Sequence, residues 1–166
     1  MKFKIVELSE ASKVFELTSN CAKKLLEDGI QQWDNTYPSL EIIKSDIASK
    51  SVQGIYLQTR LLGVYVLDQN QSPEYASVAW KYNEKPICVI HRMAVDPNSQ
   101  GIGLGIKLLK HAEEKAKKIG YQSIRLDAFK GNKPLLSFYE KRGYQAVGEI
   151  PLEYTSGPFI CFEKKL

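Results

Sequence analysis

The sequence predicts a mixed α/β protein built around one β-sheet. Three observations carry this prediction: an amphipathic helix follows the first strand, short alternating strands fill the middle, and a strand–helix–strand order fills the second half. The chain has 166 residues, of which 43% are hydrophobic and 25% are charged. Because such a chain can close its own core, we expect a single domain over residues 1–166.

The first half of the chain is expected to start with one strand and two helices. Residues 2–8 alternate apolar and charged side chains, which predicts a strand. Ser9 is expected to cap a helix that ends at Gly29, and Ser39 to cap a shorter one that runs to about Ala48. An antiparallel meander should follow. Its predicted strands are 52–58, 61–67, 75–82 and 87–95.

The second half is expected to pair in parallel. The strongly apolar strand 87–95 leads through a glycine-rich loop, 100–105, into a long amphipathic helix that ends near Gly120. The next strand is 123–129, and this order implies a right-handed crossover between parallel strands. The remaining predicted elements are a helix from Asn132 to about Arg142 and strands at 144–150 and 159–164.

Composition excludes several classes of protein. No run of about 18 apolar residues is present, and residues 1–8 do not resemble a signal peptide. The three cysteines and two histidines have no metal-binding spacing, so we expect no metal. The net charge is +4 and the basic residues are spread along the chain, so neither nucleic acid nor a membrane is an expected partner. These features favour a cytoplasmic protein.

The glycine-rich loop is the most informative segment. Gly101, Gly103 and Gly105 alternate at the start of a helix, where glycine permits close backbone approach and unpaired N–H groups carry a partial positive charge. This predicts a phosphate or pyrophosphate site, although a turn that only starts the helix is an alternative. The spacing does not fit a dinucleotide fold, for which Asp127 would be the acid, and no Walker lysine follows.

Two motifs resemble a known family. Gln100-x-x-Gly103-x-Gly105 is similar to the Arg/Gln-x-x-Gly-x-Gly/Ala signature of the GNAT N-acetyltransferase superfamily, and residues 90–97 resemble its fourth strand. Residues 132–143, followed by a tyrosine, resemble its Asn-x-x-Ala-x-x-x-Tyr-x-x-x-Gly-Phe region. The departures are Leu135 for alanine and Tyr144 for phenylalanine, which keep the apolar or aromatic character.

The resemblance covers nearly the whole chain and implies a GNAT-like fold. That fold has a central mixed, mostly antiparallel, twisted sheet of about six or seven strands, flanked by about four helices. The implied activity is transfer of an acetyl group from acetyl-CoA directly to a primary amine of a small molecule or peptide. A homodimer is compatible with it, because dimers are common among relatives.

The resemblance also implies which residues bind acetyl-CoA. Main-chain groups of the fourth strand would pair with the pantetheine arm, and loop amides would hold the pyrophosphate. The implied set is Met93, Ala94, Val95, Gln100, Gly101, Ile102, Gly103, Leu104, Gly105, Ile106, Asn132 and Tyr139.

Two side chains are candidates for proton transfer. Tyr139 matches the family's general acid, and a phenol stays protonated at neutral pH, so it can protonate a departing thiolate; a core tyrosine is the alternative. His91 is the candidate general base, because it shares strand parity with Met93 and Val95 and is therefore expected on the same face. A hydrogen-bonded structural histidine is equally open, and other family members use a water chain or a glutamate.

The acceptor is expected beside the loop between the first two helices. Trp33, Asp34 and Tyr37 could hold an ammonium by cation–π attraction and charge pairing, whereas anchoring of the loop in the core is the alternative for the two aromatic residues. Asp46 and His111 are expected at the solvent surface.

The sequence is therefore compatible with three functions. The leading one is the acetyl-CoA-dependent N-acetyltransferase. An acyl-CoA-binding sensor or interaction module without turnover is the alternative, although Tyr139 and Asn132 argue against it, since a sensor needs no acid. A nucleotide-dependent oxidoreductase is the third.

Overall fold

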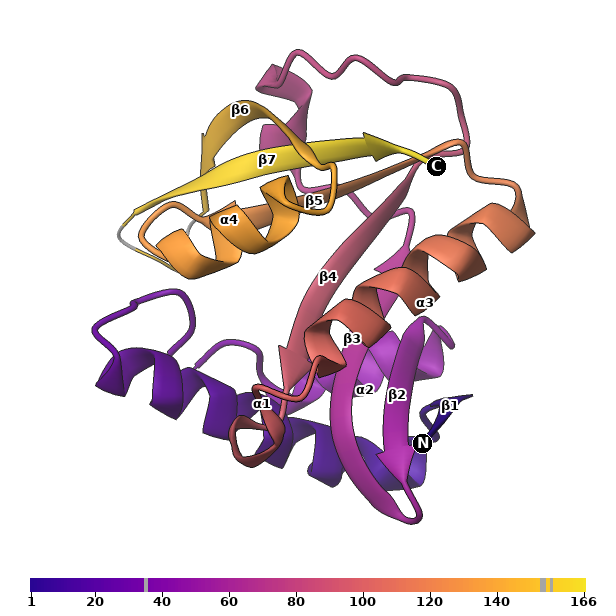
Figure 1. Cartoon of the computed structure of the whole chain (residues 1–166), viewed down its shortest axis with the longest axis vertical. Coiled ribbons are helices and arrows are strands. Elements are labelled where there is room, and N and C mark those ends of the chain that lie inside the picture. Colours follow the sequence, from indigo (N-terminus) through magenta and orange to yellow (C-terminus); the bar gives the residue numbers. More distant parts are fainter. Residues whose placement is uncertain (35, 153–154, 156) are drawn as a thin grey trace.

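The computed structural model describes residues 1–34, 36–152, 155 and 157–166. Within these residues a seven-stranded sheet runs in the order β1-β2-β3-β4-β5-β7-β6, flanked by four α-helices (Figure 1). Only β4 and β5 pair in parallel among the described strands, and the other neighbours are antiparallel. The prediction of a mixed, mostly antiparallel sheet is therefore confirmed.

The element boundaries follow the predicted order of the chain. The strands are β1 (Lys2–Ile5), β2 (Val52–Leu57), β3 (Arg60–Asp68), β4 (Cys88–Val95), β5 (Ser123–Phe129), β6 (Gln145–Pro151) and β7 (Pro158–Lys165). The α-helices are α1 (Ala11–Glu27), α2 (Leu40–Ala48), α3 (Leu104–Ile119) and α4 (Lys133–Glu140). Short 3-10 helices are η1 (Leu8–Glu10), η2 (Pro73–Ser77) and η3 (Pro97–Ser99).

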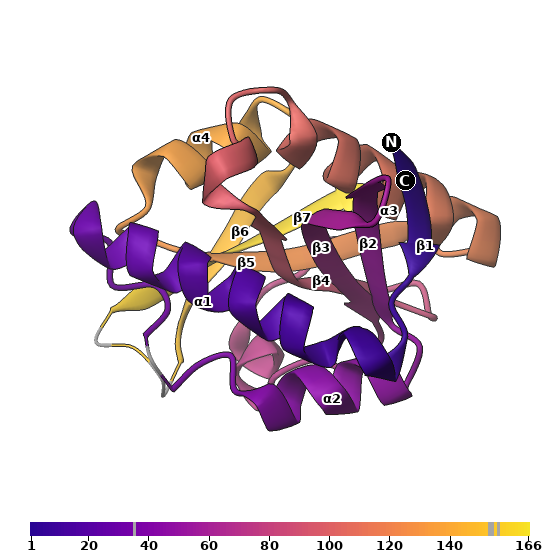
Figure 2. The same cartoon turned by 90° about the horizontal axis from the view of Figure 1, so that it is seen from below.

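The helices cover the sheet in two layers. Figure 2 shows α1 and α2 over one face and α3 and α4 over the other. The apolar stripe of α3, with Leu108 and Leu109, packs on Tyr65 and Leu126 of the sheet, while Val14 of α1 packs in a separate cluster on the opposite face. None of the helices in the described ranges is long and apolar enough to cross a bilayer.

One predicted helix start and one predicted strand are wrong. Ser9 lies in η1, and α1 begins after Glu10 without a side-chain cap. The predicted strand 75–82 is not formed; the chain instead turns through η2, and the Trp80 indole donates a hydrogen bond to the carbonyl of Tyr75 (2.9 Å). Pro73 fixes a backbone angle suited to a helical first turn, which explains why η2 replaces a strand.

Two side chains expected at the surface are instead packed. The Nδ1 atom of His111 lies 2.8 Å from the Tyr65 hydroxyl, and its ring stacks on Phe3 at 3.7 Å between centroids. Burial lowers the pKa of His111, with a further contribution from Lys115. Asp46 forms an ion pair with Arg92, with only 12% of its side chain exposed. Periodicity could not reveal either contact, because both partners come from distant segments.

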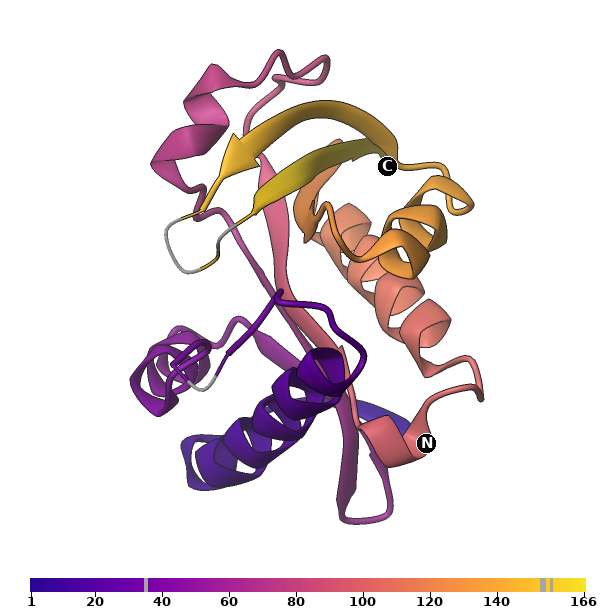
Figure 3. The ribbon, with the colours of Figure 1, turned by 90° about the vertical axis from the view of Figure 1, so that its left-hand side faces the viewer.

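The sheet opens between β4 and β5. These strands pair only at Cys88 with Ile124 and at Val89 with Arg125. β4 continues along β3 to Val95, and β5 continues along β7 to its last residue. The second half of β4 therefore has a free edge inside the molecule, where β6 and β7 turn away from β2 and β3 (Figure 3).

A β-bulge in β4 decides which way its side chains point. Arg92 has a left-handed backbone (φ 46°), and the pairing with β3 shifts register there, between Val64 and Val66. After the bulge, Met93 and Val95 pack on the α3 and α4 side. His91 lies opposite Val66, which faces α1 and α2. The prediction that His91 shares a face with Met93 and Val95 is therefore wrong.

Candidate active site

The glycine-rich loop begins at the end of β4 with a rigid turn. Asp96 caps η3 by accepting a hydrogen bond from the Asn98 amide (3.0 Å), and it pairs with the Arg60 guanidinium (2.6 Å). Gly101 and Gly103 follow with left-handed backbones (φ 81° and 80°), a conformation that favours glycine.

The start of α3 is open. Its N-cap is Gly103, with no side-chain cap hydrogen bond, so the first helical N–H groups are not satisfied by a capping side chain. A Cβ at Gly101 or Gly103 would meet nothing within 4 Å. The loop thus presents exposed backbone donors at the positive end of a helix, which fits a pyrophosphate group.

A cavity of about 60 Å³ lies where β4 and β5 diverge. Its walls come from the α1–α2 loop, β4, β5, α4 and β7, which are far apart in the sequence. The lining residues are Gln32, Trp33, Tyr37, Ile90, His91, Arg92, Met93, Asp127, Leu135, Tyr139 and Phe159. The fold therefore brings together five of the site residues predicted from the sequence: Trp33, Tyr37, His91, Met93 and Tyr139.

Tyr139 of α4 is held by aromatic packing. Its side chain is buried and its ring contacts those of Tyr144 and Phe162, with centroids 5.6 and 5.8 Å away. Burial, with a further contribution from Asp127, raises the pKa of Tyr139 above its ordinary value. Its hydroxyl has no hydrogen-bond partner in the described part of the chain. It is therefore a protonated phenol on the cavity wall, able to donate.

Asn132 joins α4 to the α1–α2 loop. Its Oδ1 accepts a hydrogen bond from the Leu135 amide (3.2 Å), which confirms the predicted N-cap. Its Nδ2 donates to Oε1 of Gln32 (2.9 Å), a residue that lines the cavity. Through this contact the cap also fixes one wall of the site.

His91 is held at one ring nitrogen. Its Nε2 lies 3.0 Å from the carbonyl oxygen of Asn70 and 3.2 Å from Oδ1 of Asp68. Burial acts to raise the pKa of Asp68, but the hydrogen bonds from His91 and Asn70 outweigh it, and the net pKa is lowered. These contacts are those of a positioned histidine, and its Nδ1 has no hydrogen-bond partner in the described ranges.

Arg92 lines the cavity, and its guanidinium is bound to α2. Its guanidinium donates to both carboxylate oxygens of Asp46 (2.7 and 2.8 Å), and its Nη1 donates to the Tyr37 hydroxyl (3.1 Å). A bidentate pair of this kind fixes geometry as well as charge. It therefore locks the bulge of β4 to α2 and holds Tyr37 against the cavity.

The α1–α2 loop places its three predicted residues differently. Trp33 is buried and meets Tyr37 edge-on, with ring centroids 6.5 Å apart, so it both anchors the loop and lines the cavity. Asp34 is exposed and lies outside the lining. Its Oδ1 accepts hydrogen bonds from the Thr36 hydroxyl (2.7 Å) and from the amides of Thr36 (2.7 Å) and Tyr37 (3.0 Å), which lower the pKa of Asp34. Asp34 thus shapes the turn.

Asp127 was not predicted as a residue of this site. It is the only carboxylate among the described lining residues, and its Oδ2 accepts a hydrogen bond from the Tyr75 hydroxyl (2.7 Å). Burial raises its pKa, although Tyr75, His91 and Arg92 act in the opposite direction. The sequence did carry a signal, because Asp127 shares a strand parity with Ser123 and Arg125 in a central strand, where an acid is rare.

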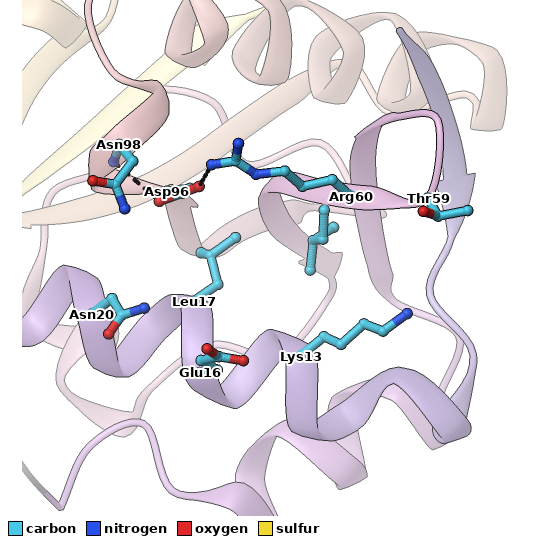
Figure 4. A pocket seen from close by; sticks show the side chains of 9 residues that line it. Lys13, Glu16, Leu17, Asn20, Thr59, Arg60, Asp96 and Asn98 are labelled. Atoms are coloured by element: carbon cyan, nitrogen blue, oxygen red, sulfur yellow. Dashed lines mark hydrogen bonds and ion pairs between the residues drawn. The ribbon is translucent and has the colours of Figure 1, made fainter.

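A larger pocket of about 360 Å³ lies elsewhere, between α1, the β2–β3 turn and the start of the loop (Figure 4). Its polar lining mixes both signs of charge, with Lys13 and Glu16 opposite the Arg60–Asp96 pair. None of the predicted catalytic residues lines it. The chemistry suggested by Tyr139 therefore belongs to the smaller cavity.

The fold and the loop together define a class: a transferase that draws on an acyl-coenzyme A thioester. Residues 22–144 match the model of the Acetyltransferase (GNAT) family, which is more than half of the chain. The chain belongs to the GNAT family and is an acetyl-CoA-dependent N-acetyltransferase.

Two relatives come from Bacillus subtilis (strain 168). The uncharacterized N-acetyltransferase YesJ is 27% identical over 162 residues, covering 95% of this chain and 86% of YesJ. The uncharacterized protein YdhI is 37% identical over 59 residues, and that match spans only 36% of this chain and 37% of YdhI.

Solved structures share the fold. A GNAT-family acetyltransferase from Streptococcus agalactiae 2603 superposes with a TM-score of 0.85 at 19% identity, over 99% of this chain and 95% of that one. The PaiA N-acetyltransferase from Thermoplasma acidophilum, in complex with coenzyme A, gives 0.73 at 19% identity, over 99% and 98%. The mixed sheet is thus the GNAT fold.

Proposed function

We propose that the chain transfers the acetyl group of acetyl-CoA to a primary amine of a small molecule or peptide, in the cavity where β4 and β5 diverge. The observation that carries this proposal is Tyr139, a buried phenol without a hydrogen-bond partner in the described ranges, on the wall of that cavity. A group placed there can donate a proton to a leaving thiolate.

Acetyl-CoA supplies an activated acyl group as a thioester. Backbone amides of the loop and helix start, Gln100 to Ile106, would hold its pyrophosphate, because α3 begins without a capping side chain. Main-chain groups of Met93, Ala94 and Val95 would pair with the pantetheine arm along the free edge of β4. Asn132 lies at the start of α4 on the far side of this opening and would contact the same arm.

Two protons leave the acceptor nitrogen when an ammonium becomes an amide. His91 is the proposed acceptor of the first, through Nδ1, because Nε2 is held by Asn70 and Asp68. Tyr139 protonates the departing sulfur and is reprotonated by the second proton from nitrogen. The overall reaction converts acetyl-CoA and an ammonium into an amide, a thiol and one released proton.

The decisive experiment follows thiol release from acetyl-CoA with a panel of primary amines. Release that requires an amine, together with an acetylated product seen by mass spectrometry, would support the proposal. Binding of acetyl-CoA without thiol release on any amine would favour the sensor or interaction module instead.

A further inference from the structure

We propose that Asp127, oriented by Tyr75, is the binding site for the acceptor's ammonium group, so that the acceptor is an amine that docks as a cation. This inference rests on the proposed function, since it names the substrate class of the same cavity. Asp127 of β5 thereby replaces Asp34, in the α1–α2 loop, as the proposed anionic partner of the amine.

The geometry of Asp127 leaves one carboxylate oxygen available. Tyr75 donates to Oδ2 at 2.7 Å and so fixes the plane of the carboxylate from the η2 side. Oδ1 has no hydrogen bond or ion pair with any described residue. Because Asp127 lines the cavity together with Tyr139 and His91, a cation bound at Oδ1 would lie beside both proposed proton-transfer groups.

The charges around the cavity do not supply a counter-ion for Asp127. The Nε2 atom of His91 lies 3.2 Å from Oδ1 of Asp68. The Arg92 guanidinium donates to both carboxylate oxygens of Asp46 (2.7 and 2.8 Å). The His91 ring and the Arg92 guanidinium thus each already have another acid as a partner. A largely buried carboxylate without a cation is costly, and an ammonium entering the cavity would compensate it.

The remaining walls of the cavity are suited to an alkylammonium group of small cross-section. Trp33 and Tyr37 present aromatic rings, which attract a cation over their faces. The cavity is small, about 60 Å³, which favours a narrow group such as the end of an aminoalkyl chain. The acceptor would therefore reach Asp127 through a narrow primary-amine arm, with its bulk outside.

The groups that act on Asp127 come from several elements. Tyr75 of η2 and the charges of His91 and Arg92 of β4 lower its pKa, against the larger effect of burial. Tyr139 of α4 and Cys161 of β7 are in turn influenced by it, since Asp127 contributes to the raised pKa of each. Protonation of Asp127 would remove the anion, so ammonium binding should weaken as the pH falls.

The test measures binding rather than turnover. Titration calorimetry on the coenzyme A complex would compare n-butylammonium with n-butanol, which is similar in shape but uncharged. We expect the wild-type protein to prefer the ammonium by about tenfold or more, and Asp127→Asn to lose that preference while binding coenzyme A normally. Asp28→Asn removes the same charge from an exposed site on the end of α1 and should keep the preference.

A second variant covers the case in which Asp127→Asn does not fold, as judged by its thermal unfolding. Tyr75→Phe keeps the carboxylate but removes the hydrogen bond that lowers its pKa, so ammonium binding should be lost at a higher pH than in the wild type. An unchanged preference in Asp127→Asn, an unshifted pH dependence in Tyr75→Phe, or no preference in the wild type would overturn the inference.

Failure of the inference is separable from failure of the proposed function. If the chain releases thiol with amines but Asp127→Asn does so with an unchanged KM for the amine, only the ammonium site is wrong. If butylammonium binds through Asp127 and no amine elicits thiol release, the transfer reaction is wrong instead.

Discussion

The two sides of the opening between β4 and β5 are built by different means. The side proposed for acetyl-CoA is made mainly of backbone, from the free edge of β4 and one continuous loop, 100–105, at the start of α3, with Asn132 of α4 added. The side proposed for the acceptor is made of side chains from five segments, and the contact between Gln32 and Asn132 joins residues 100 positions apart. Recognition of a shared cofactor is therefore local in sequence, whereas recognition of the acceptor depends on the complete fold.

The largest expected effect concerns the residue at which the two sides meet. Tyr139→Phe keeps the ring packing but removes the proton donor, so kcat should fall by about 10²–10⁴-fold. The Kd for acetyl-CoA should change by less than about twofold, because no backbone donor is lost. Steady-state kinetics and calorimetry check the two values. Equal turnover in the variant would remove Tyr139 from the mechanism.

The next prediction tests the acceptor side alone. His91→Gln should lower kcat by about 10²-fold at neutral pH and remove the acidic limb of the kcat profile measured at saturating amine, since a general base must be unprotonated to act. Acetyl-CoA affinity should stay at the wild-type value. An acidic limb that persists in the variant would leave His91 as a positioning residue for Asp68 and the Asn70 turn.

The third prediction tests the backbone side. Gly103→Ala places a Cβ on a left-handed residue at the start of α3, which costs about 1–2 kcal/mol. The loop would relax to relieve this strain and would no longer match the pyrophosphate. Coenzyme A affinity should therefore fall by roughly tenfold. Gly29→Ala is the matched control, because Gly29 is also left-handed (φ 75°) and also has open space at its Cβ. It should lose similar stability in urea unfolding and keep its coenzyme A affinity. A loss of affinity in both variants would mean that global stability, rather than the loop, sets the affinity.

The smallest effect concerns pH and stability on the acceptor side. Because the folded-state pKa of Asp68 is lowered, its contribution to the free energy of unfolding is present above the unfolded-state pKa near 4 and is lost as the pH falls through the folded value. Asp68→Asn should therefore be less stable than the wild type at pH 7, by about 1 kcal/mol or less, with the gap closing below about pH 4. Urea unfolding at pH 7 and pH 3 measures this, and a gap that widens on acidification would contradict it.

The sequence predicted the parts of the fold that depend on neighbours along the chain. Ser39 and Asn132 cap their helices as expected, because capping needs only the next three residues. The glycine spacing likewise located the loop. The strand predicted at 75–82 was lost to a local turn that Pro73 starts.

What the sequence did not reveal depends on contacts across the sheet. The bulge at Arg92 arises from pairing with β3 and reverses the face of His91, which a strict alternation of strand residues cannot anticipate. The acid that lines the cavity is likewise Asp127 and not Asp34, because the divergence of β4 from β5 exposes Asp127 there. Such residues are found from the pairing register, not from spacing.

The unfinished pairing of β4 with β5 has a consequence for self-association. A strand with unpaired backbone groups ordinarily invites another chain to add on, which leads to aggregation. Here the unpaired half of β4 lies in the interior of the sheet, between β3 and the diverging β5, rather than at an outer border. A thin extended molecule can reach it, but a second folded sheet is too wide to enter. The protein can therefore keep an unpaired strand edge at the proposed pantetheine site with little risk of polymerising through it.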